Sequence, residues 1–126
     1  MYRYRDNSGG VTQISIKYAE KHILKLGKLL RIKGYRFQST RLDGPKPLTL
    51  THEAVLVVGE KGSARFEGFL WGYFGEGPHG LRELLRQCGV EDWLAHRITY
   101  GTPRGKDLGT DWELVISSEW RKKEAA

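Results

Sequence analysis

Short segments in which apolar and polar residues alternate predict strands along much of this chain. In residues 11–18, VTQISIKY, the apolar positions are β-branched or aromatic, and this alternation favours a half-buried strand. The turn-forming stretch DNSGG at residues 6–10 separates this segment from a first strand at residues 2–4. The same pattern predicts further strands at residues 35–42, 53–58, 64–71, 97–102 and 111–118.

Residues 18–33 favour a helix instead, because apolar residues recur there at helical spacing and form one stripe. The stripe consists of Ala19, Ile23, Leu26 and Leu30. Gly34 follows basic residues, which is typical of a helix end. Gly27 opposes the helix, since a glycine inside a helix costs about 1 kcal/mol relative to alanine. A strand remains the alternative, because Leu24, Leu26, Leu30 and Ile32 also fit a strand.

A second helix is predicted at residues 78–88, directly after a run of glycines between positions 72 and 80. Pro78 suits the first turn of a helix, leucines supply its buried side, and Gly89 can end it. Residues 90–97 predict a short helix after it. The chain therefore combines strands and helices in alternation.

These elements predict an α+β fold in which two main helices (18–33 and 78–88) pack on one face of an antiparallel or mixed β-sheet. A chain of 126 residues is long enough for one core and too short for two, so we expect a single domain over residues 1–126. Its 39% hydrophobic and 29% charged residues are typical of a folded globular protein.

The apolar runs and the cysteine content bear on where the protein acts. No apolar run approaches the length of a transmembrane helix, and the first residues, MYRYRDNSGG, contain no apolar signal core. Cys88 is the single cysteine, which excludes an internal disulfide and a paired-cysteine metal motif. We therefore expect a cytoplasmic protein without a membrane segment.

The net charge of +6 is concentrated in one half of the chain. Residues 1–60 carry 11 Lys and Arg against 5 Asp and Glu, whereas residues 61–126 carry 10 of each. A basic half beside a neutral half indicates an anionic partner such as nucleic acid, a nucleotide or an acidic protein surface. A basic face that only aids solubility is the alternative.

The glycine run is the first candidate binding site, because backbone amides at a helix start and the helix dipole together can hold a phosphate. The candidate ligand-binding residues are Trp71, Gly72, Tyr73, Gly75, Gly77, His79, Arg82 and Arg104. Aromatic rings among them would stack on a base, and basic side chains would neutralise charge. Pro78 removes one amide donor, Glu76 adds a negative charge, and no known phosphate motif is present. A tight structural corner is the alternative interpretation.

A row of lysines is the second candidate site. The lysine side chains would share one face of the predicted helix and its start, and this face could follow a nucleic-acid backbone. They are Lys17, Lys21, Lys25 and Lys28. An ordinary solvated helix face would have the same composition.

Catalytic and metal chemistry have weaker support in the sequence. The four histidines lack metal-ligand spacing, so we predict no metal site and no cofactor. No nucleophile motif is present, and His79 and Cys88 are too far apart to act together on one helix. Hydrolysis of a phosphate ester with His79 as acid or base remains a hypothesis.

Residues 69–85, FLWGYFGEGPHGLRELL, preceded by RYRDNSGGVT near the N-terminus, resemble small uncharacterised bacterial and phage proteins with a W-G-Y-x-G-x-G-P-x-x-L signature. The resemblance implies that one structural unit is formed by Trp71, Gly72, Tyr73, Gly75, Gly77 and Pro78. It implies no catalytic residues, because that family has no known activity. Its phage setting makes counter-defence, through sequestration of a nucleotide signal, a hypothesis for this chain.

The sequence thus favours a non-enzymatic protein that binds a phosphate-bearing anion, with a nucleotide as the first expectation. A basic module that docks on nucleic acid, or on a nucleic-acid-binding protein of a host, is the first alternative. A phosphate-ester hydrolase is the second. Four tryptophans and six tyrosines leave enough aromatic surface for a homo-oligomer as well.

Overall fold

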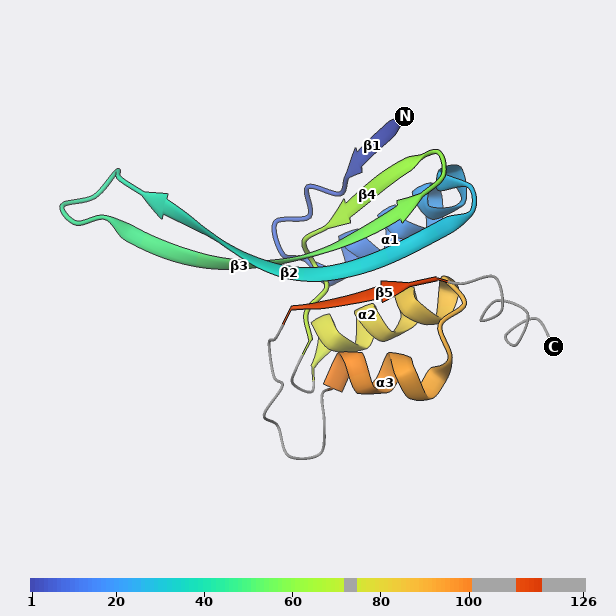
Figure 1. The fold of residues 1–126 in the computed structure, drawn as a ribbon. Helices are drawn as coiled ribbons and strands as arrows, with labels where there is room; N and C mark the ends of the chain where they lie inside the picture. The colour runs from blue at the N-terminus through green and yellow to red at the C-terminus, as the bar shows by residue number, and fades with distance from the viewer. Residues whose placement is uncertain (72–74, 101–110, 117–126) are drawn as a thin grey trace.

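The computed structural model describes residues 1–71, 75–100 and 111–116, and it has the α+β fold that the sequence predicts (Figure 1). The described elements are β1 (Tyr2–Arg5), α1 (Thr12–His22), the short 3-10 helix η1 (Ile23–Leu26), β2 (Leu29–Arg41), β3 (Leu48–Gly59), β4 (Gly62–Phe66), α2 (Glu76–Gln87), α3 (Asp92–Tyr100) and β5 (Trp112–Val115).

The strands form one mixed sheet in the order β1-β4-β3-β2-β5. The neighbours β2–β3, β3–β4 and β2–β5 are antiparallel, whereas β1 runs parallel to β4. The strand β1 can be parallel to β4 because the chain passes through α1, β2 and β3 between them. The sheet therefore joins the N-terminal strand to residues about sixty positions further on.

Residues 12–18 lie in the helix α1, so the strand predicted over residues 11–18 is wrong. The buried side of α1 is made by Thr12, Ser15 and Ala19, which are small or polar. Of the apolar residues that suggested a strand, Val11 and Ile14 are exposed, whereas Ile16 and Tyr18 are half-buried against the core. A helix that packs through small residues gives no apolar stripe, so the periodicity pointed to the wrong element.

The predicted helix over 18–33 holds only as far as Leu26, because residues 18–22 lie in α1, residues 23–26 form η1, and residues 29–33 belong to β2. The helix α1 ends at His22, and η1 leads to Gly27, whose φ of 72° lies in the left-handed region that favours glycine. The strand β2 starts two residues later, so the strand alternative holds from Leu29 onward. Gly34 lies inside β2, where the ring of Trp112 covers it and leaves no room for a side chain.

The predicted helix over 78–88 is confirmed as α2, which begins two residues earlier and ends one residue earlier. The helix α3 runs over Asp92–Tyr100, so the strand predicted from residue 97 is wrong in its described part. Ala95 and Thr99 form the buried side of α3. The β-branched residues near the end of α3 favour a strand by their sequence pattern, although they lie in a helix.

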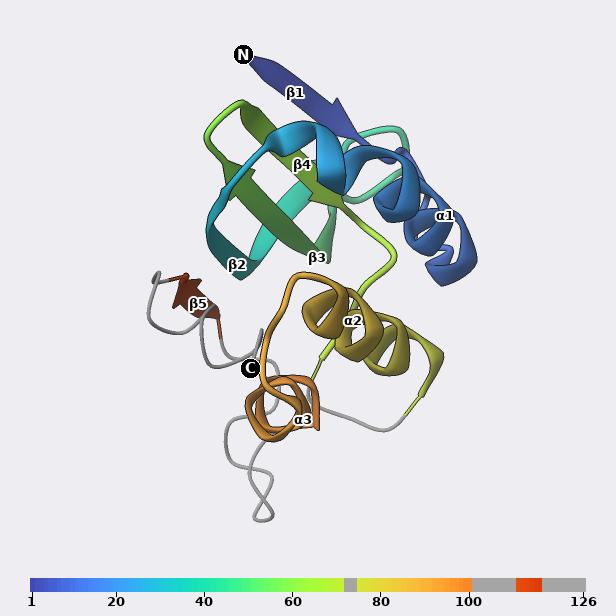
Figure 2. The ribbon, with the colours of Figure 1, turned by 90° about the vertical axis from the view of Figure 1, so that its right-hand side faces the viewer.

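The helices pack on one face of the sheet and share a single hydrophobic core with it (Figure 2). The sheet contributes Ile32, Val55, Val57, Ala64 and Phe66 to this core. The helices α1 and α2 contribute Ala19, Leu81, Leu84 and Leu85. The packing of both helices on one face agrees with the prediction, although α1 lies earlier in the chain than expected.

The strands β2 and β3 are longer than their neighbours and extend beyond the rest of the sheet as a two-stranded arm (Figure 1). We define the arm as residues 36–53. Its outer part, residues 40–49, is exposed throughout. The place where the arm leaves the body of the sheet, next to β4, is called the arm root below.

Candidate functional site

The glycine corner before α2 is built for close packing. Gly77 and Pro78 are buried, and a side-chain carbon at position 77 would lie 3.0 Å from Leu70. A side-chain carbon at Gly80 would lie 2.5 Å from the methyl group of Thr12 on α1. Gly75 precedes the helix in an extended conformation, with no side-chain cap. Two of the glycines therefore let α2 approach its neighbours closely.

Trp71, the ring expected to stack on a ligand, is only 2% exposed. It packs edge-on against Trp112, with 5.8 Å between the ring centroids. In this arrangement the indole belongs to the hydrophobic core. Gly72, Tyr73 and Arg104 lie outside the described residues.

Arg82 is engaged with the next helix. Its guanidinium donates hydrogen bonds to both carboxylate oxygens of Asp92, at 2.9 and 3.1 Å. These bonds raise the pKa of Arg82 and lower the pKa of Asp92. Arg86 lies 3.7 Å from the same carboxylate. Arg82 thus joins α2 to α3 and is not aimed at the glycine corner.

His79 is exposed and lines a groove of about 820 Å³ between α1 and α2, together with Glu20 and Glu83. Its backbone N–H donates to the carbonyl oxygen of Gly75 at 3.0 Å. Within the described residues, no carboxylate hydrogen-bonds to the His79 ring. The hydrolase hypothesis therefore gains no acid–base pair in this part of the chain.

The four lysines do not share one helix face, because α1 ends before the last two of them. Lys17 and Lys21 are exposed on α1, whereas Lys25 lies in η1 and Lys28 in the turn before β2. Lys25 Nζ lies 5.8 Å from the ring centroid of Tyr4. The expected continuous lysine face is therefore divided.

A different basic surface is formed by the face of the sheet that points away from the core, which we call the open face. Side chains of residues paired across neighbouring strands point to the same side of a sheet. The pairing gives two rows on the open face. One row is Arg3, Ser63, Val58, Arg31 and Val115, and the next is Arg5, Arg65, Leu56, Lys33 and Glu113.

None of the residues in these two rows is buried, and α1 lies behind the sheet in the view of Figure 1. The rows contain five cations against the single carboxylate of Glu113. The cations are Arg3, Arg5, Arg31, Lys33 and Arg65. Glu113 lies 3.6 Å from Arg31, and Glu67, just beyond the second row, lies 3.5 Å from Arg65, so the open face keeps a positive excess from the other three cations. In the described part of the chain, Arg3, Arg5 and Lys33 pair with no carboxylate.

At the arm root the open face becomes aromatic. The guanidinium carbon of Arg65 lies 4.6 Å from the ring centroid of Phe37. The rings of Phe37 and His52 stack at 5.0 Å, with 20° between their planes. A pocket of about 590 Å³ opens beside them, which we call the arm-root pocket. Its lining includes Arg5, Phe37, His52, Glu53, Arg65 and Glu67.

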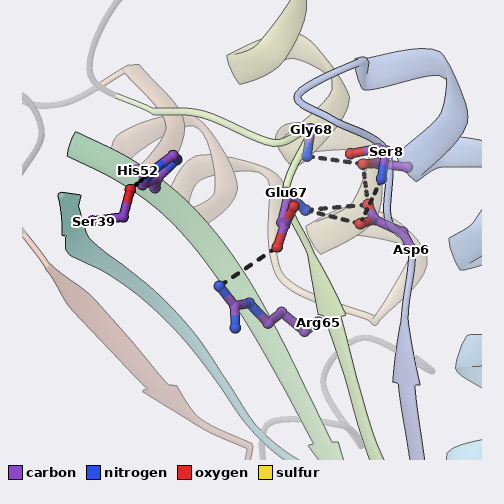
Figure 3. Close-up of polar contacts among 8 residues, drawn as sticks. Asp6, Ser8, Ser39, His52, Arg65, Glu67 and Gly68 are labelled. Carbon is purple, nitrogen blue, oxygen red and sulfur yellow. Dashed lines mark hydrogen bonds and ion pairs between the residues drawn. The ribbon is translucent and has the colours of Figure 1, made fainter. Parts of the chain in front are cut away.

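The buried carboxylate of Asp6 fixes the wall of this pocket (Figure 3). Asp6 accepts hydrogen bonds from the backbone N–H groups of Ser8 and Glu67 and from the hydroxyl of Ser15. The Ser15 hydroxyl in turn accepts from the N–H of Gly68 at 2.9 Å. One carboxylate therefore ties the loop after β1, the helix α1 and the end of β4 together.

The sequence analysis missed the open face because it assigned the first part of β2 to a helix. The available signal was the basic or aromatic residue at every second position of RIKGYRF, residues 31–37, and the two arginines of the N-terminal RYR. The pairing of β1 with β4 could not be read from any local pattern. That pairing is what brings Arg3 and Arg5 beside Arg65.

The described residues contain neither a membrane-spanning helix nor a cluster of metal ligands. No helix there is long and apolar enough to cross a membrane. No group of three or more His, Cys, Asp or Glu side chains there is arranged to hold a metal ion.

Comparisons with protein-family models, with curated proteins and with solved structures found no match to this chain. The resemblance to phage proteins over residues 69–85 therefore stays a prediction.

Proposed function

We propose that the protein binds nucleic acid through the open face, without catalysis. The observation that carries the proposal is the charge of the two central rows, in which five cations face one carboxylate. This function is the interaction-module alternative from the sequence, with the binding surface moved from the lysines of α1 to the sheet. The predicted cytoplasmic location would give the protein access to nucleic acid.

The chemistry of the open face suits a phosphate backbone. Phosphate contacts from arginine and lysine supply most sequence-independent affinity, because each contact releases counterions. Arginine predominates in the rows, and its planar guanidinium binds phosphate through two parallel hydrogen bonds. The half-buried Leu56 and Val58 between the cations give the centre of the face an apolar floor for sugars and bases.

A nucleotide at the glycine corner has less support. Trp71 is covered by protein, and Arg82 pairs with Asp92. Gly77 and Gly80 are explained by close packing against Leu70 and Thr12. Binding of a ligand to the open face would leave these contacts intact.

The test measures how salt weakens binding of a fluorescent single-stranded oligonucleotide of about 15 nucleotides, by anisotropy. The test variant is Arg3→Gln with Lys33→Gln, which removes two open-face charges that have no carboxylate partner among residues 1–71, 75–100 and 111–116. We expect the slope of log K against log salt to fall by about 1.4, since each phosphate contact on a single strand contributes about 0.7.

The matched control is Lys17→Gln with Lys21→Gln, which removes two exposed charges from α1. We expect its slope to stay near that of the natural protein. An equal fall of the slope in both variants would mean that binding depends only on the net charge of the protein and not on the open face. A loss in the α1 variant alone would place the nucleic acid on the lysines and overturn the proposal.

A further inference from the structure

We infer that the arm-root pocket holds an unstacked base of single-stranded nucleic acid, so that the protein prefers single strands to duplexes. This inference rests on the proposed function, because it concerns the same ligand on the same side of the sheet. It adds a specificity that the positive charge of the open face alone does not give.

The arm-root pocket is continuous with the open face. Arg5 and Arg65 belong to the second row of the open face and also line the pocket. A strand whose phosphates cross the rows therefore reaches the pocket without leaving the sheet. The volume of about 590 Å³ lies within the range of ordinary small-ligand sites.

Flat groups from three strands form a stacked column in the pocket. Arg65 comes from β4, Phe37 from β2 and His52 from β3, and the ring of Phe37 contacts both the guanidinium of Arg65 and the imidazole of His52. The ring of Tyr35 lies close by, 5.9 Å from the guanidinium carbon of Arg65. Bases without a partner stack on aromatic rings and on guanidinium planes, so a base can extend this column.

Ion pairs and hydrogen bonds hold the polar groups of the pocket in place, and some hydrogen-bond donors there have no partner in the described residues. Arg65 Nη2 lies 3.5 Å from Glu67, and the other guanidinium nitrogens have no carboxylate partner in the described residues. Ser39 Oγ and His52 Nε2 form a hydrogen bond of 2.6 Å, and Figure 3 draws this pair and the Arg65–Glu67 pair in one view. Glu53 is neutralised by Arg36 at 2.9 Å. The guanidinium of the exposed Arg5 is available for a phosphate or a base carbonyl group, whereas Arg65 Nε is buried without a hydrogen-bond partner in the described residues.

A duplex cannot use this pocket. Its bases are stacked on one another and paired, so their flat faces are closed to a column that lies beside the sheet. A single strand can turn one base into the pocket while its backbone stays on the cations. Preference for single strands is therefore the measurable consequence.

The experiment compares an oligo(dT) of about 15 nucleotides with a mixed-sequence duplex of the same length, for the natural protein and for Phe37→Leu. Leucine keeps the apolar contact and removes the flat ring. We expect the natural protein to favour the single strand and Phe37→Leu to bind it about 10-fold more weakly, with duplex binding changed less than twofold. Tyr2→Leu, an aromatic change on β1 outside the pocket, is the control and should retain the preference.

Two further variants keep the inference testable if Phe37→Leu does not fold. Phe37→Tyr retains the flat ring and should retain the preference, whereas Arg65→Lys retains the charge without the plane and should reduce it. Equal affinity of the natural protein for both ligands, with normal salt dependence, would overturn the inference and leave the proposed function standing. Failure to bind either ligand would overturn both.

Discussion

Arg65 is held by several contacts at once, and these contacts fix its guanidinium at the arm root. One side of the group faces the ring of Phe37, and Glu67 lies within ion-pair distance of its edge. Only 18% of the side chain is exposed. A cation that is already ordered loses little conformational freedom when a ligand binds, so Arg65 suits recognition better than a mobile surface lysine does.

Asp92 gives the structure a pH dependence at the junction of α2 and α3. The hydrogen bond from Arg82 lowers the pKa of Asp92 below its ordinary value of 3.8. A carboxyl group whose pKa is lower in the folded state stabilises the fold above the ordinary value, and this contribution is lost as the pH falls through the lowered pKa. We expect urea unfolding of Asp92→Asn to show a shallower loss of stability below about pH 4 than the natural protein shows.

The variant Arg82→Gln supplies the check on this pair. It removes the donor and should flatten the acid dependence in the same way as Asp92→Asn. Unchanged acid dependence in both variants would show that this pair does not couple pH to folding.

At the scale of elements, Gly80 sets how closely α2 crosses α1. An added side-chain carbon would meet the methyl group of Thr12 at 2.5 Å. Alanine normally stabilises a helix interior by about 1 kcal/mol relative to glycine. Here overpacking should prevail and lower the free energy of unfolding by about 1–3 kcal/mol in Gly80→Ala, as measured by denaturant titration.

A second substitution separates packing from helix propensity. Thr12→Ser removes the methyl group and keeps the hydroxyl that donates to the carbonyl oxygen of Gly68 at 2.7 Å. Added to Gly80→Ala, it should restore most of the lost stability. Gly44→Ala, at the exposed end of the arm, is the control and should change stability little. Loss of stability that Thr12→Ser does not relieve would contradict this account.

The elements that sequence patterns predicted correctly are those whose buried side is made of large apolar residues. The leucines of α2 gave its position to within two residues. The helix α1 was missed because its buried residues are Thr12, Ser15 and Ala19, which carry no hydrophobic period. The start of β2 was predicted only as the alternative to a helix, because Leu26 and Leu30 fit a helix and a strand equally well.

At the scale of the whole molecule, the fold separates its charges from its core by using the two faces of one sheet. The excess of basic residues in the first half of the chain was visible in the sequence and predicted an anionic partner. The position of these basic residues on one face of the sheet was not visible in the sequence, because the open face depends on the pairing of β1 with β4 and of β2 with β3. Such pairings join residues far apart in the sequence, which local periodicity does not report.

The most direct test of the account is an NMR titration of the nitrogen-15-labelled protein with an oligonucleotide of about 15 nucleotides. It distinguishes the open face, the lysines of α1 and the glycine corner in one measurement. We expect the largest backbone amide shifts around Arg3, Lys33 and Arg65, on three strands of the open face. Shifts confined to residues 75–80, or to the surroundings of Lys17 and Lys21, would contradict the account.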